Sequence, residues 1–501
     1  MSATIKVDPA RVLAKIDPRI YSGFLEHLGR CIYGGVVEYN GKPELINEKG
    51  FRVDVADALK KLDMPVVRYP GGNFVSSYHW IDGVGPKELR PQRPELAWLT
   101  EESNQFGTDE FMEWCEYMKV EPFICLNMGT GTLDEALGWL EYCNSDKNTY
   151  YANLRRKNGH EKPYNVKYWG LGNEIYGDWQ VGNLSAEEYA VKAGQWARAL
   201  KLLDPTIELI SCGWNGFSEW DHHIAKELVK YADYHSIHLY TFHKDYYRKV
   251  TQPYAAERAI EITAKLLELA KITNNVTESK IKVAYDEYNI WDAENSGQPT
   301  GVEQNYNFGD ALAFTTYLHV FVRQAEHLGM ANIAQCVNVI APVMSNPDGI
   351  FLQTIFYPFQ LFSQHMRGTS LAVNVEAPIL ALTDEPGSRA DQEDSVRWLR
   401  GLKSDFPLLT VTAAKNEKKL TLAVTNISLD QDITTRIELT GQYGSSAKQW
   451  LLYHNDITAK NTFENPDEVK VHESTIKVPS NTFQMTFAKH SFTMLQFEEV
   501  N

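Results

Sequence analysis

The sequence predicts a (β/α)8 barrel of the TIM type, followed by an antiparallel β-sandwich. Three observations lead to this fold class. Eight short apolar runs occur between about residues 18 and 345, amphipathic stretches separate them, and after about residue 370 apolar and polar residues alternate instead. At 501 residues the chain is also too long for a single hydrophobic core. We therefore expect one large domain and one smaller one.

The eight apolar runs are predicted to form the parallel strands of the barrel. They are nearly continuous in apolar residues and alternate with helix-forming segments, which is typical of strands buried on both faces. In chain order they cover residues 20–28, 65–72, 122–129, 167–174, 207–215, 234–240, 280–289 and 332–342. Eight units favour a closed barrel. A doubly wound open sheet is the alternative that this pattern leaves open.

The segments between the runs have the periodicity of helices. Apolar residues at three- and four-residue spacing predict helices over 53–62, 109–119, 185–203, 255–272 and 309–329. The helix over 185–203 has the clearest limits. Ser185 is followed three residues later by Glu188, which is a capping-box pattern, and the helical pattern stops before Asp204-Pro205.

Residues 408–441 and 469–498 alternate apolar and polar side chains, as antiparallel strands do. Turn-like breaks at "KNEKK" (415–419) and "SLDQD" (428–432) divide the first segment into short strands of sandwich type. The stretch "ATIKVD" (3–8) alternates in the same way, and we expect it to join the sandwich. The predicted domains are residues 18–370 for the barrel and residues 1–17 with 371–501 for the sandwich.

The charge of the chain narrows the classes of partner. A formal net charge of −16 repels nucleic acid and anionic membrane surfaces, so we predict neither as a partner and expect a neutral substrate. None of the six cysteines lies in a C-x-x-C pair, so the sequence indicates neither a zinc knuckle nor a redox dithiol. The first residues show no signal-peptide core, and no run reaches the length of a membrane span. We expect a cytoplasmic protein.

Polar side chains lie at the ends of the predicted strands, where a barrel places its chemistry. These residues are Glu26, Arg68, Asn73, Asn127, Asn173-Glu174, Trp214-Asn215, His238, Tyr240, Asp286-Glu287 and Asn338. Any one of them could simply be a polar residue that enters a solvated loop. The joint pattern is more informative, because Glu174 on the fourth strand and Glu287 on the seventh would face each other across the barrel mouth.

Two facing glutamates suit the hydrolysis of a glycoside. One carboxylic acid protonates the leaving oxygen, and the other carboxylate stabilises or captures the positive anomeric centre, so the reaction needs neither metal nor cofactor. We predict no metal site. His235 and His238 lie close in sequence to a His-His pair (222–223), but consecutive or alternate positions do not converge on one ion. We interpret His238 as a polar residue of the barrel.

Several long motifs resemble glycoside hydrolase family 51, the α-L-arabinofuranosidases. "YWGLGNE" (168–174) resembles the acid/base strand of that family, and "VAYDEYNIW" (283–291) resembles its nucleophile strand. Four further stretches are similar to the family: "IYSGFLEHLGRCIYGGV" (20–36), "VVRYPGGNFVSSYHWIDGVGP" (66–86), "NQFGTDEFMEWCE" (104–116) and "MANIAQCVNVIAP" (330–342). The likeness covers about residues 20–360 closely and the sandwich by architecture.

This resemblance implies a retaining enzyme that releases non-reducing-end α-L-arabinofuranosyl units from oligo- and polysaccharides. It implies that Glu174 is the general acid/base and that Glu287 is the nucleophile. It implies substrate-binding roles for Glu26, Arg68, Asn73, Trp98, Asn173, Trp179, Tyr240 and Gln353. Arg68 could instead form a structural ion pair beneath the site, and either tryptophan could be core packing.

A retaining pair should have its carboxyl groups about 5–5.5 Å apart. We also expect burial and the charge of Glu287 to raise the pKa of Glu174. Two other functions stay open: an endo-β-glycanase for glucan or xylan on the same barrel, and a sugar-binding protein without activity, which the intact carboxylates disfavour. Members of the family often form oligomers, which implies a homo-oligomer.

Overall fold

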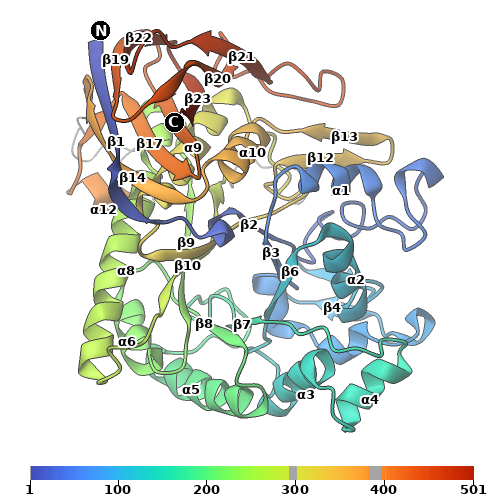
Figure 1. Cartoon of the computed structure of the whole chain (residues 1–501). Helices are drawn as coiled ribbons and strands as arrows, with labels where there is room; N and C mark the ends of the chain where they lie inside the picture. Colours follow the sequence, from blue (N-terminus) through green and yellow to red (C-terminus); the bar gives the residue numbers. More distant parts are fainter. Residues whose placement is uncertain (1, 293–301, 383–395, 401, 501) are drawn as a thin grey trace.

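A closed barrel and a nine-stranded sheet make up the molecule (Figure 1). The computed structural model describes residues 2–292, 302–382, 396–400 and 402–500. Every neighbouring pair of barrel strands is parallel, which confirms the predicted barrel and excludes an open sheet. The barrel strands are β2 (Ser22–Phe24), β3 (Val66–Tyr69), β6 (Glu121–Cys125), β7 (Tyr168–Leu171), β8 (Glu208–Ser211), β9 (Tyr234–Thr241), β10 (Lys282–Ile290) and β11 (Leu328–Ile333).

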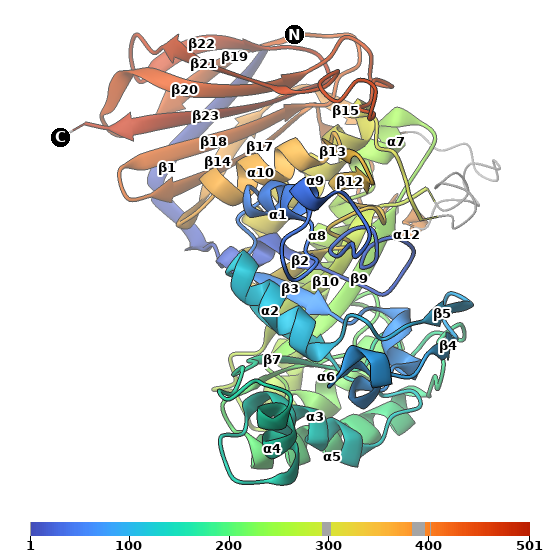
Figure 2. The same ribbon diagram turned by 90° about the vertical axis from the view of Figure 1, so that its right-hand side faces the viewer.

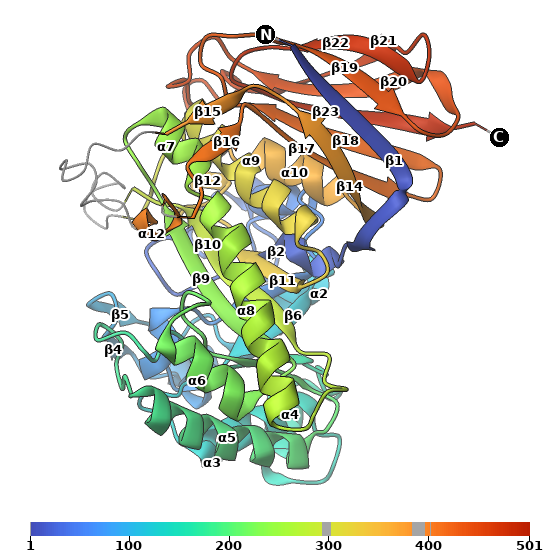
Figure 3. The same ribbon diagram turned by 90° about the vertical axis from the view of Figure 1, so that its left-hand side faces the viewer.

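Helices surround the barrel strands (Figures 1 and 3). The predicted capping box at Ser185 is present, with its side chain accepting from the backbone of Glu188 and the Glu188 carboxylate accepting from the backbone of Ser185. The helices are α1 (Val53–Lys60), α2 (Thr108–Met118), α3 (Leu133–Asn144), α4 (Tyr150–Lys157), α5 (Ala186–Leu203), α6 (Glu219–Leu228), α7 (Tyr246–Thr251), α8 (Tyr254–Thr273), α9 (Phe308–Arg323), α10 (Phe356–His365) and α12 (Arg397–Arg400).

The eighth barrel strand differs from the prediction. It was expected over 332–342 but covers Leu328–Ile333, and the helix before it ends at Arg323 rather than 329. Short apolar runs suit a buried strand or a buried helix equally, so periodicity does not separate them. Residues 334–342 cannot continue the strand because Asn338 and Ile340 have φ of 60° and 36°, outside the extended region.

The barrel interior is filled below its mouth by apolar side chains. Seven strands each contribute one residue to a buried cluster, which consists of Val66, Phe123, Tyr168, Ile210, Tyr234, Ala284 and Met330. Each of these residues lies before the last residue of its strand, so the polar strand ends stand above a packed floor. This arrangement leaves the C-terminal mouth of the barrel as the place for chemistry.

The second body is a mostly antiparallel sheet that curls so that its end strands β21 and β22 lie near each other (Figures 1 and 2). The N-terminal strand β1 joins it, pairing antiparallel with β14 and parallel with β19. In spatial order the strands are β21 (Val471–Lys477), β20 (Tyr443–Tyr453), β23 (Ser491–Glu499), β18 (Lys419–Asn426), β17 (Leu409–Asn416), β14 (Thr369–Glu376), β1 (Ser2–Lys15), β19 (Ile433–Leu439) and β22 (Thr482–Phe487). The proposed domain limits themselves remain a prediction.

Helix α9 connects the two bodies. Its residues from Phe308 to Val322 are all buried, as expected for a helix that is covered on every side (Figure 3). His319 lies within hydrogen-bond distance of the hydroxyls of Thr412 and Thr425 on the sheet. Burial holds the pKa of His319 well below its ordinary value, so this contact is neutral.

Short elements and side-chain chemistry complete the description. The hairpins pair β4 (Arg93–Glu95) with β5 (Thr100–Glu102), β12 (Val343–Asn346) with β13 (Gly349–Leu352), and β15 (Ile379–Ala381) with β16 (Asp405–Pro407). Short 3-10 helices cover Pro18–Tyr21, Pro43–Leu45, Asn73–Ser77, Trp80–Gly83 and Lys87–Leu89. All six cysteines are free and buried. Among the described residues, no helix has the length and apolar character needed to span a membrane.

Candidate active site

Three functional side chains meet at the C-terminal mouth of the barrel. One carboxylate oxygen each from Glu174 and Glu287 and one ring nitrogen of His238 all lie within 4.8 Å of one another. Glu174 follows β7, His238 lies on β9, and Glu287 lies on β10. The two glutamates that the sequence places on the fourth and seventh strands are therefore neighbours in space.

The local backbone explains why the carboxylates can approach so closely. The strand β7 ends at Leu171, and Glu174 beyond it has a φ of 45°, a left-handed conformation that costs energy for a residue with a side chain. On the facing loop, a Cβ at Gly72 would lie 3.0 Å from Oε1 of Glu287, and one at Gly71 would lie 2.5 Å from Cγ of Glu26. The glycines of "YPGGN" therefore leave room for acidic side chains.

Glu287 is held by a cation and a phenol. Nη1 of Arg68 donates to Oε1 of Glu287 at 2.7 Å, and the Tyr240 hydroxyl donates to its Oε2 at 2.8 Å. Nη2 of Arg68 donates to Oδ1 of Asn173 at 2.5 Å. Arg68 is 1% exposed and holds Glu287 and Asn173 in place, which is an ion pair of the kind that the sequence left as an alternative. Its predicted role in substrate binding remains a prediction.

Glu174 is surrounded by three donors. Nδ1 of His238 lies 2.9 Å from its Oε1, the Tyr176 hydroxyl donates to Oε1 at 3.0 Å, and Nε1 of Trp179 donates to Oε2 at 3.0 Å. On the other side of the imidazole, Nε2 of His238 lies 3.2 Å from Oδ1 of Asp286. The imidazole thus bridges the carboxylate of Glu174 and a second, buried carboxylate.

The pKa of Glu174 is lowered, not raised as the sequence analysis expected. Burial alone raises that pKa, but the hydrogen bond and charge of His238 outweigh burial and lower it. Burial alone lowers the pKa of His238, yet the charge of Glu287, followed by the hydrogen bond and charge of Asp286, raises it to about 10. The free enzyme therefore holds one proton in the pair, mainly on the imidazole.

Glu174, His238 and Glu287 are also ligand types that could surround a metal ion. A metal-bound histidine must be neutral, so a proton and an ion would compete for His238. The absence of a metal site remains a prediction.

A second group of predicted residues forms the wall beside Glu287. Oε1 of Glu26 accepts from the backbone N–H of Phe74 at 3.0 Å and from Nε1 of Trp98 at 3.1 Å. Its Oε2 accepts from Nε2 of Gln335 at 2.9 Å. Burial and then the charge of Glu287 raise the pKa of Glu26 to about 7. Nδ2 of Asn173 donates to Oδ1 of Asn73 at 3.4 Å, which joins this wall to the catalytic pair.

The two predicted tryptophans differ in burial: Trp98 is half-buried and packs against the hydrophobic core, whereas Trp179 is exposed. The Trp179 side chain is 57% exposed. Trp98 lies on the tip of the β4–β5 hairpin, half-buried, with its backbone N–H donating to Glu95. Both indoles donate to a site carboxylate, to Glu174 and Glu26 respectively. Their roles toward a sugar remain predictions.

Several of the polar residues named from the sequence lie outside this group. Gln353 is fully buried, its amide donates to the backbone oxygens of Gln304 and Ala341, and its Oε1 accepts from the backbone of Tyr306. These contacts are typical of a structural residue. The sugar contact predicted for Gln353 remains a prediction. Asn127 and Asn338 likewise bond mainly to loop backbone, as polar residues in loops often do.

Sequence reasoning did not assign a functional role to His238, Asp286 or Gln335. His238 and Asp286 were noted at strand ends, and their position opposite acidic residues was the available signal. Gln335 gave no signal in the sequence. It contacts Glu26, which follows β2, from the loop after β11, and the two residues are 309 positions apart.

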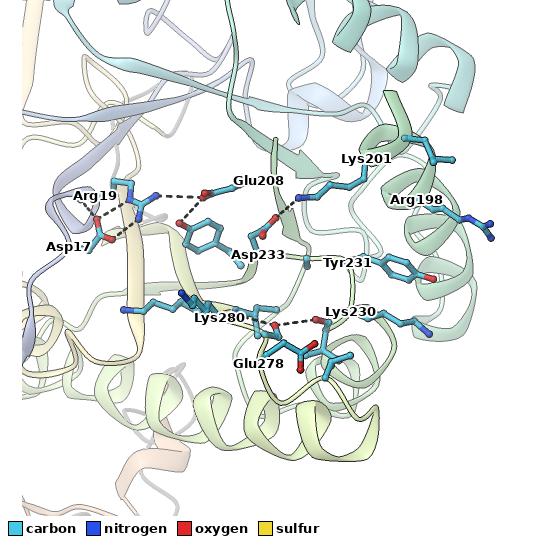
Figure 4. A pocket seen from close by; sticks show the side chains of 18 residues that line it. Asp17, Arg19, Arg198, Lys201, Glu208, Lys230, Tyr231, Asp233, Glu278 and Lys280 are labelled. Atoms are coloured by element: carbon cyan, nitrogen blue, oxygen red, sulfur yellow. Dashed lines mark hydrogen bonds and ion pairs between the residues drawn. The ribbon is translucent and has the colours of Figure 1, made fainter. Parts of the chain in front are cut away.

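A pocket of about 790 Å³ opens at the opposite end of the barrel from these side chains (Figure 4). It is lined by residues at the beginnings of strands and by the ends of neighbouring helices. Its charges largely compensate each other: Arg19 pairs with Asp17 at 2.6 Å and with Glu208 at 3.7 Å, and Lys201 pairs with Asp233 at 3.0 Å. It lacks the close carboxylate pair of the barrel mouth.

Fold and site together define a glycoside hydrolase of the barrel type. Models of two domains match the chain: the "Alpha-L-arabinofuranosidase 1 domain" over residues 58–258 and the "Alpha-L-arabinofuranosidase C-terminal domain" over residues 286–491. The chain is 49% identical over 510 residues to the "Probable alpha-L-arabinofuranosidase C" of Aspergillus niger, covering 99% of this chain and 97% of that one. It belongs to the α-L-arabinofuranosidases of glycoside hydrolase family 51.

Two further relatives extend the comparison. The "Intracellular exo-alpha-(1->5)-L-arabinofuranosidase 1" of Bacillus subtilis is 34% identical over 519 residues, with 99% of each chain covered. The thermostable GH51 α-L-arabinofuranosidase from Thermotoga petrophila, a solved structure, is 38% identical. The match covers 99% of this chain and 100% of that chain, with a TM-score of 0.88.

Proposed function

We propose that this protein is a retaining, exo-acting α-L-arabinofuranosidase in which Glu287 is the nucleophile and Glu174 is the general acid/base. The observation that carries the proposal is the proximity of the two carboxylates, whose nearest oxygens lie within 4.8 Å. Retaining pairs have their carboxyl groups about 5–5.5 Å apart, whereas inverting pairs, which must admit a water between them, are about 6.5–9.5 Å apart.

In the first step, an oxygen of Glu287 attacks the anomeric carbon while the bond to the leaving oxygen breaks. Arg68 and Tyr240 hold the attacking carboxylate in one orientation, which lowers the cost of reaching the reactive geometry. The proton shared by Glu174 and His238 moves to Glu174 and then to the leaving oxygen. The aglycone departs as an alcohol, and the sugar remains on Glu287 as an ester.

In the second step, water replaces the aglycone. The carboxylate of Glu174 takes a proton from this water, whose oxygen attacks the anomeric carbon and releases Glu287. Two inversions at the same carbon give net retention. The hydrogen bonds of Trp179 and Tyr176 stabilise the anionic form of Glu174 that this step needs at its start.

Glu26, Asn73, Asn173 and Trp98 form the wall on which we place the hydroxyl groups of the arabinofuranosyl unit. Their polar atoms converge beside Glu287. The Bacillus relative, which is named an intracellular exo-acting enzyme, supports exo action and a cytoplasmic location for this chain too. A homo-oligomer is still expected, and light scattering of the purified protein would measure it.

The decisive assay compares terminal with internal cleavage. The protein should hydrolyse 4-nitrophenyl α-L-arabinofuranoside and release arabinose first as the α-anomer. Proton NMR spectra recorded during the first minutes identify the anomer. Rapid shortening of a linear glucan or xylan without release of arabinose would instead establish the endo-β-glycanase, which the names of the relatives do not favour. Binding of arabinosides without turnover would establish a sugar-binding protein.

A further inference from the structure

An aromatic group stands beside the acid/base carboxylate and continues beyond it. Tyr176 and Trp179 both donate to Glu174, and the Trp214 ring stacks on Tyr176 with ring centroids 4.8 Å apart and planes 19° apart. Trp179 meets Tyr176 edge-on at 5.9 Å. Because Glu174 delivers its proton to the leaving oxygen, these three rings mark the leaving-group side of the site.

Trp214 presents a free surface at this position. The residue is 42% exposed, although one ring face is covered by Tyr176. Its exposed area therefore lies on the parts of the residue that Tyr176 does not cover. Together with Trp179, which is 57% exposed, Trp214 gives the mouth of the barrel a pair of accessible indoles next to the proton donor.

The loop that carries Trp214 is fixed by hydrogen bonds rather than free to move aside. The backbone N–H of Trp214 donates to Oδ1 of Asp221 at 2.8 Å, and that of Gly216 donates to Oδ2 of Asp221 at 2.9 Å. The carbonyl of Trp214 accepts from the backbone of His238 at 2.9 Å. A large ring that is held in place loses little conformational entropy when a ligand packs on it.

We propose that Trp214 forms the floor of the leaving-group subsite, where its free face stacks on the sugar ring next to the scissile bond. The proposal rests on the proposed glycosidase function, which fixes Glu174 as the proton donor. An uncharged sugar ring with an apolar C–H face suits an indole surface on this acidic protein. Trp214 then selects leaving groups that are rings over those that are small.

Tyr176 lies between Trp214 and Glu174, so a role of Trp214 in leaving-group binding can be tested separately from proton transfer by Glu174. Its hydroxyl bonds directly to Glu174, so removal of the Trp214 ring leaves that hydrogen bond and those of His238 and Trp179 in place. The kcat/KM for a substrate whose leaving group has no ring should not depend on Trp214. The kcat/KM for a substrate with a sugar leaving group should fall when the Trp214 ring is removed.

The test compares two substrates in Trp214→Ala. Hydrolysis of an α-linked arabinofuranosyl disaccharide should lose about tenfold in kcat/KM, which corresponds to about one ring-stacking contact. Hydrolysis of α-L-arabinofuranosyl fluoride, whose leaving group is a single ion, should stay within about twofold of the wild type. Trp214→Phe, which keeps an aromatic face, should recover most of the activity on the disaccharide.

Two results would overturn the proposal. Equal losses on both substrates would mean that Trp214 only supports Glu174 through Tyr176, and unchanged kinetics on both would mean that no sugar rests on it. Circular dichroism and the melting temperature of Trp214→Ala identify a folding defect, in which case the Phe variant decides. If the wild-type protein fails to hydrolyse the fluoride, the proposed function itself fails, which is a distinguishable outcome.

Discussion

The substitution Arg68→Met tests how the buried charges of the site are balanced. Two cations, Arg68 and protonated His238, oppose the carboxylates of Glu174, Asp286 and Glu287. Methionine keeps an apolar stem of similar length but leaves only His238 against the three carboxylates. Burial raises the pKa of Asp286, and the charge of Arg68 together with His238 outweighs it and lowers that pKa.

The size of the effect follows from the burial of the pair. Arg68 is 1% exposed and Glu287 is 5% exposed, and removal of one partner from such a pair costs about 3–5 kcal/mol of unfolding free energy. The size of this loss depends on pH. The pKa of Asp286 is lowered in the folded state, so its carboxylate stabilises that state above its ordinary pKa of about 4. The loss in the variant should therefore be greatest near pH 7 and shrink toward pH 4.

Urea denaturation of Arg68→Met at pH 7 and pH 5 measures this loss, and kcat/KM at pH 7 measures its functional part. The value of kcat/KM should fall, because the attacking carboxylate has lost the donor that holds its orientation. Arg68→Lys is the matched control: it keeps the charge but not the two-pronged contact, so its losses should be smaller. A fully stable Arg68→Met variant with an unchanged kcat/KM would refute the proposed charge balance.

Three further outcomes follow from the same site. In His238→Asn, Glu174 titrates without its partner, so the alkaline limb of kcat/KM should fall by at least about one pH unit from the region near 10; an unmoved limb would show that the imidazole holds no catalytic proton. In Glu174→Ala, a 2,4-dinitrophenyl arabinofuranoside should still form the glycosyl-enzyme, and azide should speed turnover to an azide product of retained configuration. Glu287→Ala should lose several powers of ten in activity and give at most the inverted azide. Equal rescue by azide in both variants would mean that the two roles are assigned wrongly. Because the pKa of Glu26 is raised to about 7, its contribution to stability is present below about pH 4.5 and is lost as pH rises through 7, so Glu26→Gln should show a flatter dependence of unfolding free energy between pH 5 and 8; an unchanged pH dependence would contradict this.

Local signals in the sequence predicted much of the fold. The capping box at Ser185 and the turn-like breaks of the C-terminal segment depend on residues within a few positions of each other, and the structure has them where the pattern predicts. The eighth strand was misplaced because Leu328–Ile333 is apolar without a period. Its state is decided by packing: a Cβ at Gly329 would lie 2.7 Å from the Tyr234 ring of another strand.

The site could be predicted only as far as single residues carry chemistry. The two glutamates were found because a barrel brings strand ends together. The bridging role of His238 could not be found, because it depends on distances to Glu174 and Asp286, which are 64 and 48 residues away in the chain. The direction of the pKa of Glu174 was wrong for the same reason, since its sign depends on that imidazole.

The covalent intermediate offers the most direct test of the central claim. The protein is treated with an activated 2-deoxy-2-fluoro-α-L-arabinofuranoside, which should form the ester quickly and hydrolyse slowly, and its peptides are mapped by tandem mass spectrometry. We predict that one fluorosugar is attached to Glu287 and that the label is lost in Glu287→Ala. Attachment to Glu174 or to any other side chain would contradict the assignment of the nucleophile.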